Sequence, residues 1–185
     1  MKKLLFFLMI GWVALASSCK KESPPEFLYG VPLTFKFRLL NEAGKEATEF
    51  KQGQNITFNL LMTNYSNNRW DFLASRLPSD YNFLRVFQVV NATDSLDLGQ
   101  PYDRKVWCSD YDVAIKPNET FDLKFNWASD STQISKSICG MRGTNKMVLP
   151  IGKYKTGFTY RFQFTEGDSF RISKPIRFDL DFSVK

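Results

Sequence analysis

Hydrophobic and polar residues alternate with a period of two through most of this chain. The clearest runs are 120–127, 153–164 and 175–184, where aromatic and aliphatic side chains take nearly every second position. Two earlier runs, 32–41 and 55–64, show the same pattern. Because successive side chains of a strand point to opposite faces, each run predicts a β-strand with one buried and one solvated face.

Shorter apolar runs lie between these strands. They predict further strands at 70–74, 82–90, 94–98, 105–108 and 111–115, with 82–90 as a central strand. Proline and asparagine predict a turn at 116–119. The segment 128–147, rich in Ser, Thr, Asp, Gly and Lys, predicts a long loop, with one short helix within it as the alternative. No window of comparable length has helical periodicity. The pattern therefore predicts a single all-β domain of two antiparallel sheets packed face to face.

The beginning of the chain follows a different pattern. Two lysines precede an apolar run over 4–16, and two serines precede Cys19. A charged head, an apolar middle and small residues before a cysteine resemble a bacterial lipoprotein signal peptide. The apolar run is shorter than the roughly 20 residues that a transmembrane helix requires. We therefore expect residues 1–18 to be removed and Cys19 to carry the lipid; a plain secretory signal is the alternative.

This signal defines the expected organisation of the chain. Residues 19–27 are charged and contain two adjacent prolines, which predicts a flexible tether, and residues 28–185 form the folded domain. By the same resemblance, the protein is expected in the cell envelope of a Gram-negative bacterium, held on the outer membrane in preference to the inner one. Each methylene that enters the bilayer contributes roughly 0.8 kcal/mol to such anchoring.

The cysteine count becomes informative once the signal is removed. Of three cysteines, Cys108 and Cys139 remain when Cys19 is lipidated. An even pair in an oxidising, exported compartment predicts a disulfide, which would stabilise the fold by roughly 3 to 4 kcal/mol. The alternative is a pair of buried free thiols.

The charge balance is mildly basic. The chain has 25 Lys and Arg against 19 Asp and Glu, a net charge of +6, and removal of the two leader lysines leaves 23 against 19, or +4. The basic residues are spread over many strands. Because nucleic-acid binding requires basic residues clustered on one face or helix, we expect no nucleic-acid partner.

The sequence contains no histidine. This removes the Ser-His-Asp and Cys-His arrangements and any histidine-ligated metal, so we expect no catalytic residues, no metal and no cofactor, and we predict that the protein is not an enzyme. Asp179 and Asp181 could form a carboxylate pair. They fall, however, on the predicted solvated face of their strand, whereas a glycosidase buries one carboxyl group of its pair.

Several short motifs resemble those of the intracellular proteinase inhibitor (BsuPI-like) domains. The first is the strand and turn at 58–66, which reads Phe-Asn-Leu-Leu-Met-Thr-Asn-Tyr-Ser. The others follow in that family's order, at 81–83, 106–107, 115–119, 125–127 and 149–154. The resemblance, over about residues 55–162, implies a single antiparallel immunoglobulin-like β-sandwich with a Pro-x-Glu turn and a Pro-x-Gly-x-Tyr turn before core strands. The chain departs from the family at Asn118, where glycine is usual, in the missing tryptophan after Trp107, and in the length of 128–147.

Aromatic side chains near predicted turns are the candidate binding residues. They are Tyr65, Trp70, Tyr102, Trp107 and Tyr111. Loop aromatics on a rigid sandwich commonly contact peptides, sugars or other proteins. The alternative is that each ring folds back over the core.

The sequence therefore predicts a lipid-anchored envelope lipoprotein whose sandwich acts as a non-catalytic binding or structural module. Its expected partners are the membrane, through the lipid on Cys19, and an envelope protein or glycan that the sequence does not identify. The resemblance implies a second possibility, which is proteinase inhibition through a protruding loop.

Overall fold

The computed structural model describes residues 29–74, 86–104, 112–130 and 141–185. Their strands are β1 (Leu33–Leu40), β2 (Glu49–Phe50), β3 (Thr57–Asn64), β4 (Trp70–Phe72), β5 (Val89–Asn91), β6 (Asp97–Gly99), β7 (Asp103–Arg104), β8 (Val113–Ile115), β9 (Thr120–Asn126), β10 (Met141–Arg142), β11 (Gly152–Tyr160), β12 (Gln163–Glu166), β13 (Ser169–Ile172) and β14 (Ile176–Val184). This confirms the predicted all-β sandwich. The predicted strand at 105–108 lies outside the described residues. Within the described ranges, no helix is long and apolar enough to cross a membrane.

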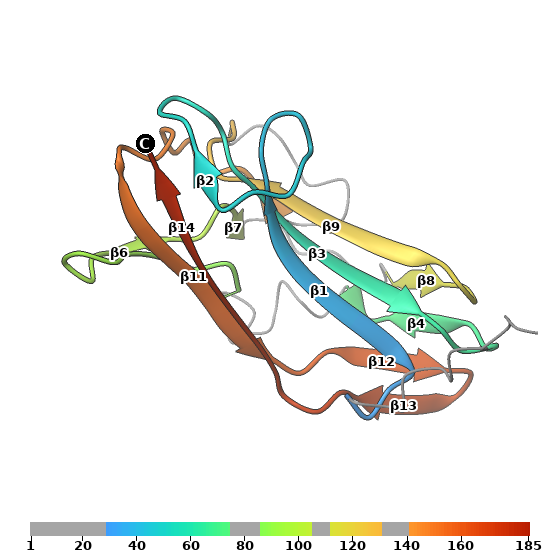
Figure 1. Ribbon diagram of the computed structural model, residues 1–185. Helices are drawn as coiled ribbons and strands as arrows, with labels where there is room; N and C mark the ends of the chain where they lie inside the picture. The colour runs from blue at the N-terminus through green and yellow to red at the C-terminus, as the bar shows by residue number, and fades with distance from the viewer. Residues whose placement is uncertain (1–28, 75–85, 105–111, 131–140) are drawn as a thin grey trace, which may run out of the picture.

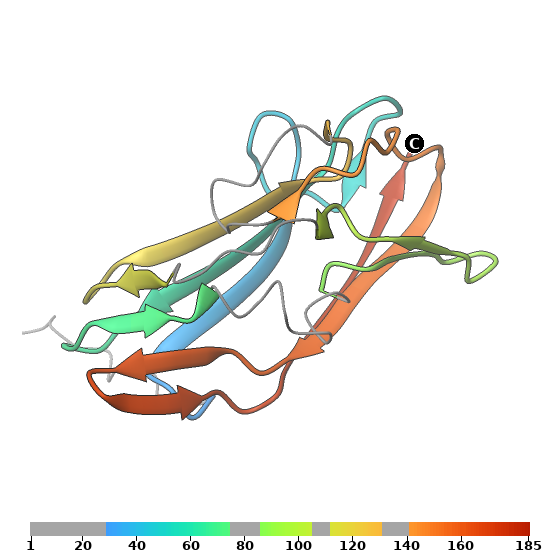
Figure 2. The ribbon, with the colours of Figure 1, turned by 180° about the vertical axis from the view of Figure 1, so that it is seen from behind.

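Most of the strands form two layers, as Figures 1 and 2 show, and β7 and β10 form a separate two-stranded sheet. One layer is the antiparallel sheet β1-β3-β9. The other layer contains the five-stranded sheet β2-β14-β11-β5-β6 and the four-stranded sheet β13-β12-β4-β8. The chain passes between these two sheets twice, because β11 leads directly into β12 and β13 leads directly into β14. The second layer is therefore one surface with a bend, and it covers β1-β3-β9 along its length.

Aromatic rings fill the space between the layers. The ring of Phe37 on β1 has its centroid 5.4 Å from that of Phe158 on β11 and 5.2 Å from that of Phe87. Nearer the bend, Phe35 stacks on Phe162 at 4.9 Å. The inward residues predicted for the first two long strands are buried: Leu33, Phe35, Phe37, Leu39, Ile56, Phe58, Leu60 and Met62. The period-two pattern thus identified this core correctly.

The structure divides one predicted strand and shortens another. The run 153–164 is broken after Tyr160, because the chain changes from the five-stranded to the four-stranded sheet there. Phe162 remains fully buried in the break, and its backbone N–H donates to Ser173 Oγ at 2.9 Å. Residues 82–85 of the predicted central strand 82–90 lie outside the described residues, and of the others Val89 and Val90 belong to β5. Phe87 precedes it in a turn, with a φ of 63°.

The predicted turn at 116–119 is present between β8 and β9. The backbone N–H of Glu119 donates to the carbonyl of Lys116 at 3.0 Å, and Asn118 has a φ of 62°. Asparagine adopts this left-handed conformation more readily than most residues with a side chain, and glycine adopts it without strain. Asn118 therefore suits the left-handed position in this turn.

The Pro-x-Gly-x-Tyr segment forms a corner at the start of β11. The hydroxyl of Tyr154 donates to the carbonyl of Pro150 at 2.7 Å, and the residue is 1% exposed. A Cβ atom at Gly152 would lie 3.0 Å from that hydroxyl oxygen, so glycine leaves the room that the ring needs. Immunoglobulin-type sandwiches contain a corner of this kind, in which a tyrosine bonds to the backbone a few residues upstream.

We predict that Tyr154→Phe lowers the free energy of unfolding by about 1 kcal/mol, because the Pro150 carbonyl loses its donor while the ring still packs. Urea unfolding followed by tryptophan fluorescence measures this difference. Tyr65→Phe, at a residue that is 50% exposed, is the matched control and should leave the midpoint unchanged. Equal midpoints for both variants would contradict a structural role for the corner.

Candidate functional site

The structure describes only part of the predicted site. Cys19, Trp107, Cys108, Tyr111 and Cys139 all lie outside the described residues. The lipid attachment, the disulfide and two of the five candidate aromatics therefore remain predictions from the sequence.

Two of the candidate binding aromatics belong to the core. Trp70 is 4% exposed and Tyr102 is 2% exposed. Each side chain places its polar atom inside: the Trp70 indole N–H donates to Ser66 Oγ at 3.2 Å, and the Tyr102 hydroxyl donates to the Val86 carbonyl at 3.0 Å. Their selection as surface residues is wrong, because both rings fold back over the core. This is the alternative that the sequence left open.

The burial of Tyr102 also changes its ionisation. Its ring centroid lies 4.6 Å from that of Phe125. Burial, and to a smaller extent the negative charge that Tyr160 can acquire, raises the pKa of the Tyr102 hydroxyl well above its ordinary value. The neutral phenol is therefore the form that the folded protein favours.

Tyr65 is the candidate aromatic that the described part of the chain places on the surface. It follows β3 directly, is 50% exposed, and its backbone N–H donates to the carbonyl of Pro32 at 3.2 Å. The backbone is therefore held while the ring faces solvent. Because Trp70 and Tyr102 are buried, they form no exposed aromatic surface with Tyr65.

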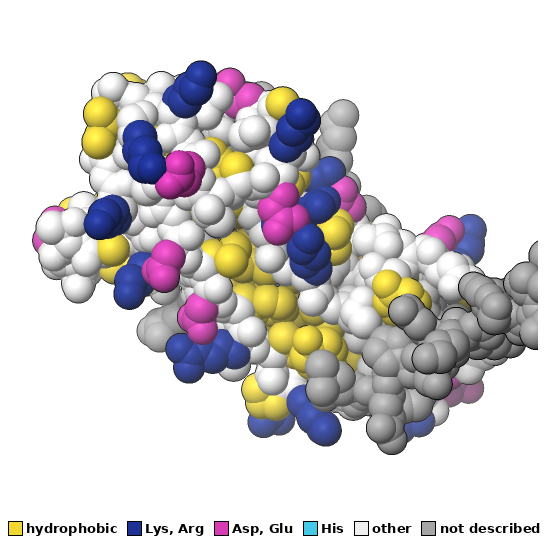
Figure 3. Space-filling view, viewed as in Figure 1, with side chains coloured by type: hydrophobic (Ala, Val, Ile, Leu, Met, Phe, Trp, Pro, Cys, Tyr) yellow, Lys and Arg dark blue, Asp and Glu magenta, His cyan; other side chains and the backbone are white. Residues whose placement is uncertain are grey.

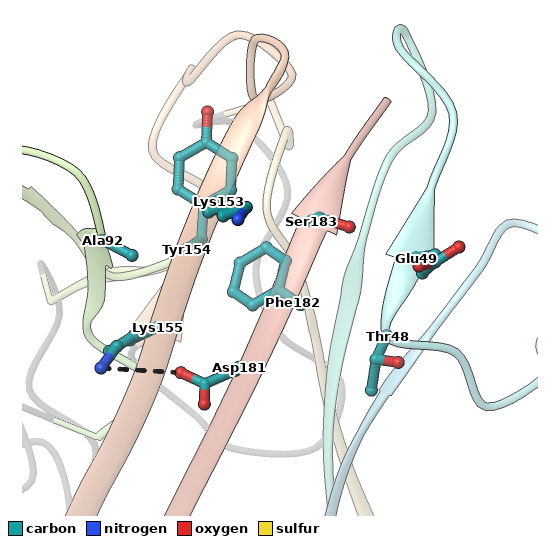
Figure 4. A pocket seen from close by; sticks show the side chains of 9 residues that line it. All are labelled: Thr48, Glu49, Ala92, Lys153, Tyr154, Lys155, Asp181, Phe182 and Ser183. Atoms are coloured by element: carbon teal, nitrogen blue, oxygen red, sulfur yellow. Dashed lines mark ion pairs between the residues drawn. The ribbon is translucent and has the colours of Figure 1, made fainter.

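The sequence missed two grooves on the outer face of the five-stranded sheet. The first, of about 380 Å³, is shown in Figure 4 and is lined chiefly by side chains of β2, β11 and β14. The second, of about 480 Å³, lies beside β5, β11 and β14. The two share Lys155 and Asp181, so they form one continuous charged surface along β11 and β14.

Opposite charges face each other across this surface. Lys155 Nζ lies 4.0 Å from Asp181 Oδ1, the pair that Figure 4 marks. Arg177 Nε donates to Asp179 Oδ2 at 2.6 Å. The side chains of Asp179 and Asp181 are 62% and 81% exposed, which confirms that both lie on the solvated face. Neither carboxylate has the burial that would make it the acid of a hydrolytic pair.

Gly157 lies beside the two ion pairs on this face. It is paired with Asp179, and a Cβ atom there would lie 2.7 Å from both the Asp179 Oδ1 atom and the Phe178 carbonyl oxygen. Any side chain would therefore displace the backbone or the carboxylate. Because glycine has no side chain, there is room for the Asp179 carboxylate over β11, and no side chain at position 157 fills the second groove.

β14 also has a long unpaired edge. Its outer edge bonds to the short parallel strand β2 at one end, where the N–H of Ser183 donates to the Thr48 carbonyl at 2.9 Å. Between Ile176 and Phe182, no other described strand pairs with this edge. In the view of Figure 3, hydrophobic side chains gather at the surface between β14 and β1. We call residues 176–182 of β14 the β14 edge.

A larger polar groove, of about 620 Å³, lies over the outer face of β1-β3-β9. Its neighbouring side chains bond mostly to each other. Arg38 Nε donates to Asn59 Oδ1 at 2.7 Å, and Asn59 Nδ2 donates to Asp122 Oδ1 at 2.5 Å. The sequence placed Asn59 on the solvated face, whereas it is fully buried under these charged neighbours. This network stabilises the outer surface of the sheet and satisfies the polar groups that a ligand would need.

One lysine is partly desolvated by the fold. Lys146 lies 4.2 Å from the centre of the Trp127 ring, and its ammonium group donates to the Leu98 carbonyl. Burial lowers the pKa of Lys146, and the nearby charge of Asp97 opposes that effect. Through these contacts Lys146, in the segment before β11, is bonded to Leu98 of β6. Among the described residues, no group of three or more potential metal ligands occurs.

Comparisons with known proteins add a distant structural similarity. No protein-family model and no curated protein sequence matches the chain. A crystal structure of a β-glucosidase from Listeria innocua, in complex with gluconolactone, matches 81% of this chain and 16% of its own, at 10% identity and a TM-score of 0.28. This chain therefore spans a small part of that protein, and a similarity at this level carries no argument about function.

We predict that the free energy of unfolding falls as the pH rises above about 10, the ordinary pKa of tyrosine. Tyr102 has its pKa raised in the folded state, so the stability it contributes is present below the unfolded pKa and is lost as the unfolded chain ionises first. Urea unfolding at several alkaline pH values measures the slope. Tyr102→Phe should flatten it, whereas Tyr65→Phe should not; identical slopes for the two variants would contradict the prediction.

Proposed function

We propose that this protein is a lipid-anchored component of the cell envelope whose β-sandwich acts as a non-catalytic binding module. The observation that carries the proposal is the β14 edge, where unpaired backbone, an apolar surface and a row of charged side chains lie together. Exposed apolar surface with a polar rim marks interaction sites on soluble domains.

The anchoring half of the proposal rests on the beginning of the sequence. The lysines, apolar run and serines before Cys19 have the order of a lipoprotein signal. The described chain begins at Tyr29, whose carbonyl accepts a hydrogen bond from the N–H of Lys174 at 2.7 Å. The ten residues from Cys19 to Tyr29 would reach at most about 36 Å. The domain would therefore stay close to the membrane surface, with the Lys174 corner nearest to it.

The proposal that the module is non-catalytic rests on the side chains that the chain has and lacks. The chain has no histidine, and its paired carboxylates, Asp179 and Asp181, are exposed and lie next to cations. Exposed, solvated ion pairs of this kind suit recognition of a charged partner more than proton transfer. Glu49 adds a third carboxylate at the end of the same surface.

The resemblance to BsuPI-like domains supports an immunoglobulin-like sandwich. The left-handed Asn118 and the corner formed by Tyr154 fall where that resemblance places a turn glycine and a Pro-x-Gly-x-Tyr turn. A bond between Cys108 and Cys139 belongs to the same proposal, because an exported domain would meet oxidising conditions.

We predict that Cys19→Ser moves the protein from the membrane fraction to the soluble fraction, because the mutant lacks the thiol that carries the acyl chains. Immunoblotting of fractionated cells measures the shift, and mass spectrometry of the wild-type N-terminal peptide identifies the modification. Cys108→Ser, which keeps the signal intact, is the control and should remain with the membrane. An unmodified Cys19 in the native protein would refute the anchor.

Affinity capture from crosslinked envelope fractions, with the anchor intact, tests the binding role. We expect envelope proteins or glycans to be recovered with the wild type and to be lost when the exposed pair Asp179 and Asp181 is replaced by lysine. Recovery of a proteinase, together with inhibition of that enzyme by the pure protein, would favour the inhibitor alternative. No specific recovery would count against a binding module.

A further inference from the structure

The β14 edge offers a regular row of backbone hydrogen-bonding groups. Ser183 and Lys185 direct their N–H groups to the outer edge, where they donate to the carbonyls of Thr48 and Phe50 at 2.9 Å each. Backbone groups two residues apart in a strand point to the same side. The N–H and C=O groups of Arg177, Asp179 and Asp181 therefore point to this edge too, and no described strand pairs with them there.

An apolar floor lies beside these groups. Phe178 and Leu180 are the inward residues of the β14 edge, and both are only half-buried, whereas Ile176 and Phe182 at its ends are buried. The Phe178 ring bridges the two layers, at 4.7 Å from Phe158 and 6.0 Å from Phe37. The hydrophobic surface between β14 and β1 in Figure 3 continues this floor.

We infer that an extended polypeptide segment of another protein adds to the β14 edge as a further strand of the five-stranded sheet. The inference rests on the proposed binding role and names the chemistry of the partner. Three backbone positions at two-residue spacing match the repeat of a second strand, and main-chain hydrogen bonds provide affinity in strand addition. β2 occupies the edge from Ser183 onward, so the site accommodates about seven residues.

The side chains of the edge define the sequence of this segment. Residues of the added strand that face inward would cover Phe178 and Leu180, so they would be apolar. Residues that face outward would lie beside Asp179 and Asp181, which are paired with Arg177 and Lys155 and whose side chains are still 62% and 81% exposed. Opposite charges across neighbouring strands stabilise a sheet, so the outward residues would be lysine or arginine. The expected ligand alternates apolar and basic residues.

A second copy of this chain is the competing occupant of the edge. Two copies related by a twofold axis at the midpoint of residues 176–182 would place Asp179 opposite its own symmetry mate, and Arg177 of each copy opposite Asp181 of the other. Like charges directly opposite each other destabilise an antiparallel pair and opposite charges stabilise it, so the oligomeric state in solution is part of the test. Charges on an edge strand are a common means by which proteins prevent self-association.

The β1 strand is the other exposed sheet edge beside this surface, but its upper end is already occupied. The N–H of Ala47 donates to the Leu39 carbonyl at 3.0 Å, and Lys36 forms an ion pair with Glu46 at 2.6 Å. Its inward residues Phe35 and Phe37 are 8% and 7% exposed, so an added strand would gain little burial there. The half-buried side chains are on β14.

The test uses an eight-residue peptide of alternating valine and lysine, titrated into the mature full-length protein in detergent micelles. Nuclear magnetic resonance should show saturable binding below about 1 mM, with the largest shifts at the amides of Arg177, Asp179 and Asp181. A valine and glutamate peptide should bind at least about tenfold more weakly. No binding of the lysine peptide, or shifts confined to another surface, would overturn the inference.

Backbone methylation distinguishes strand addition from charge attraction. Methylation of either the lysine amides or the valine amides should abolish binding, and methylation of the other set should be tolerated, because only one edge of the peptide faces β14. The sensitive set also reports the direction, since lysine amides face β14 in an antiparallel arrangement and valine amides in a parallel one. Equal effects of the two sets would refute strand addition.

Charge variants provide the matched control. Asp179→Lys with Asp181→Lys should weaken the lysine peptide at least about tenfold and favour the glutamate peptide. Asp168→Lys, an exposed residue in the β12–β13 turn, makes the same kind of charge change and should alter neither. Unchanged selectivity in the double variant, or a wild-type protein that sedimentation shows to be a dimer through β14, would contradict the inference.

The affinity capture and the peptide titration can fail independently of each other. Peptide binding at the β14 edge without any captured partner would remove the envelope binding role and leave the site. Captured partners that remain bound to the double variant, together with a negative peptide titration, would remove the site and leave the role.

Discussion

The packing of phenylalanine rings between the two layers is the interaction on which the rest of the structure depends. Phe37 lies against rings from three other segments, Phe58, Phe87 and Phe158, and Phe58 in turn approaches Phe182 on β14. Flat rings in edge and stacked contacts fix how far the sheets can slide. The half-buried Phe178 at the margin of this cluster is thus packed against the core.

The long strands could be predicted because a strand with one buried face has an apolar residue at every second position of the sequence. The bend between β11 and β12 could not, since Phe162 keeps the alternation while the backbone changes sheet. Strands such as β2 and β10 have two residues each, too few for any period. Trp70 and Tyr102 show a related limit: a position near a turn does not determine whether a ring faces solvent or the core.

The candidate site was harder to predict than the fold for a physical reason. An edge exists only through the order of strands in a sheet, and that order is set by contacts between residues far apart in the chain, such as Ser183 with Thr48. The sequence correctly placed Asp179 and Asp181 on the solvated side. It contained no local signal that their strand would lack a neighbour. The need for glycine at position 157, beside these carboxylates, is likewise explained only by the atoms that a side chain would meet there.

The hydrogen bond between Tyr29 and Lys174 has a mechanical consequence. It ties the first described residue to the short link between β13 and β14, while the chain continues within a few residues into β1. A force applied to the segment before Tyr29 is therefore shared between both layers of the sandwich at once. The load enters near the start of β1 in one layer and of β14 in the other.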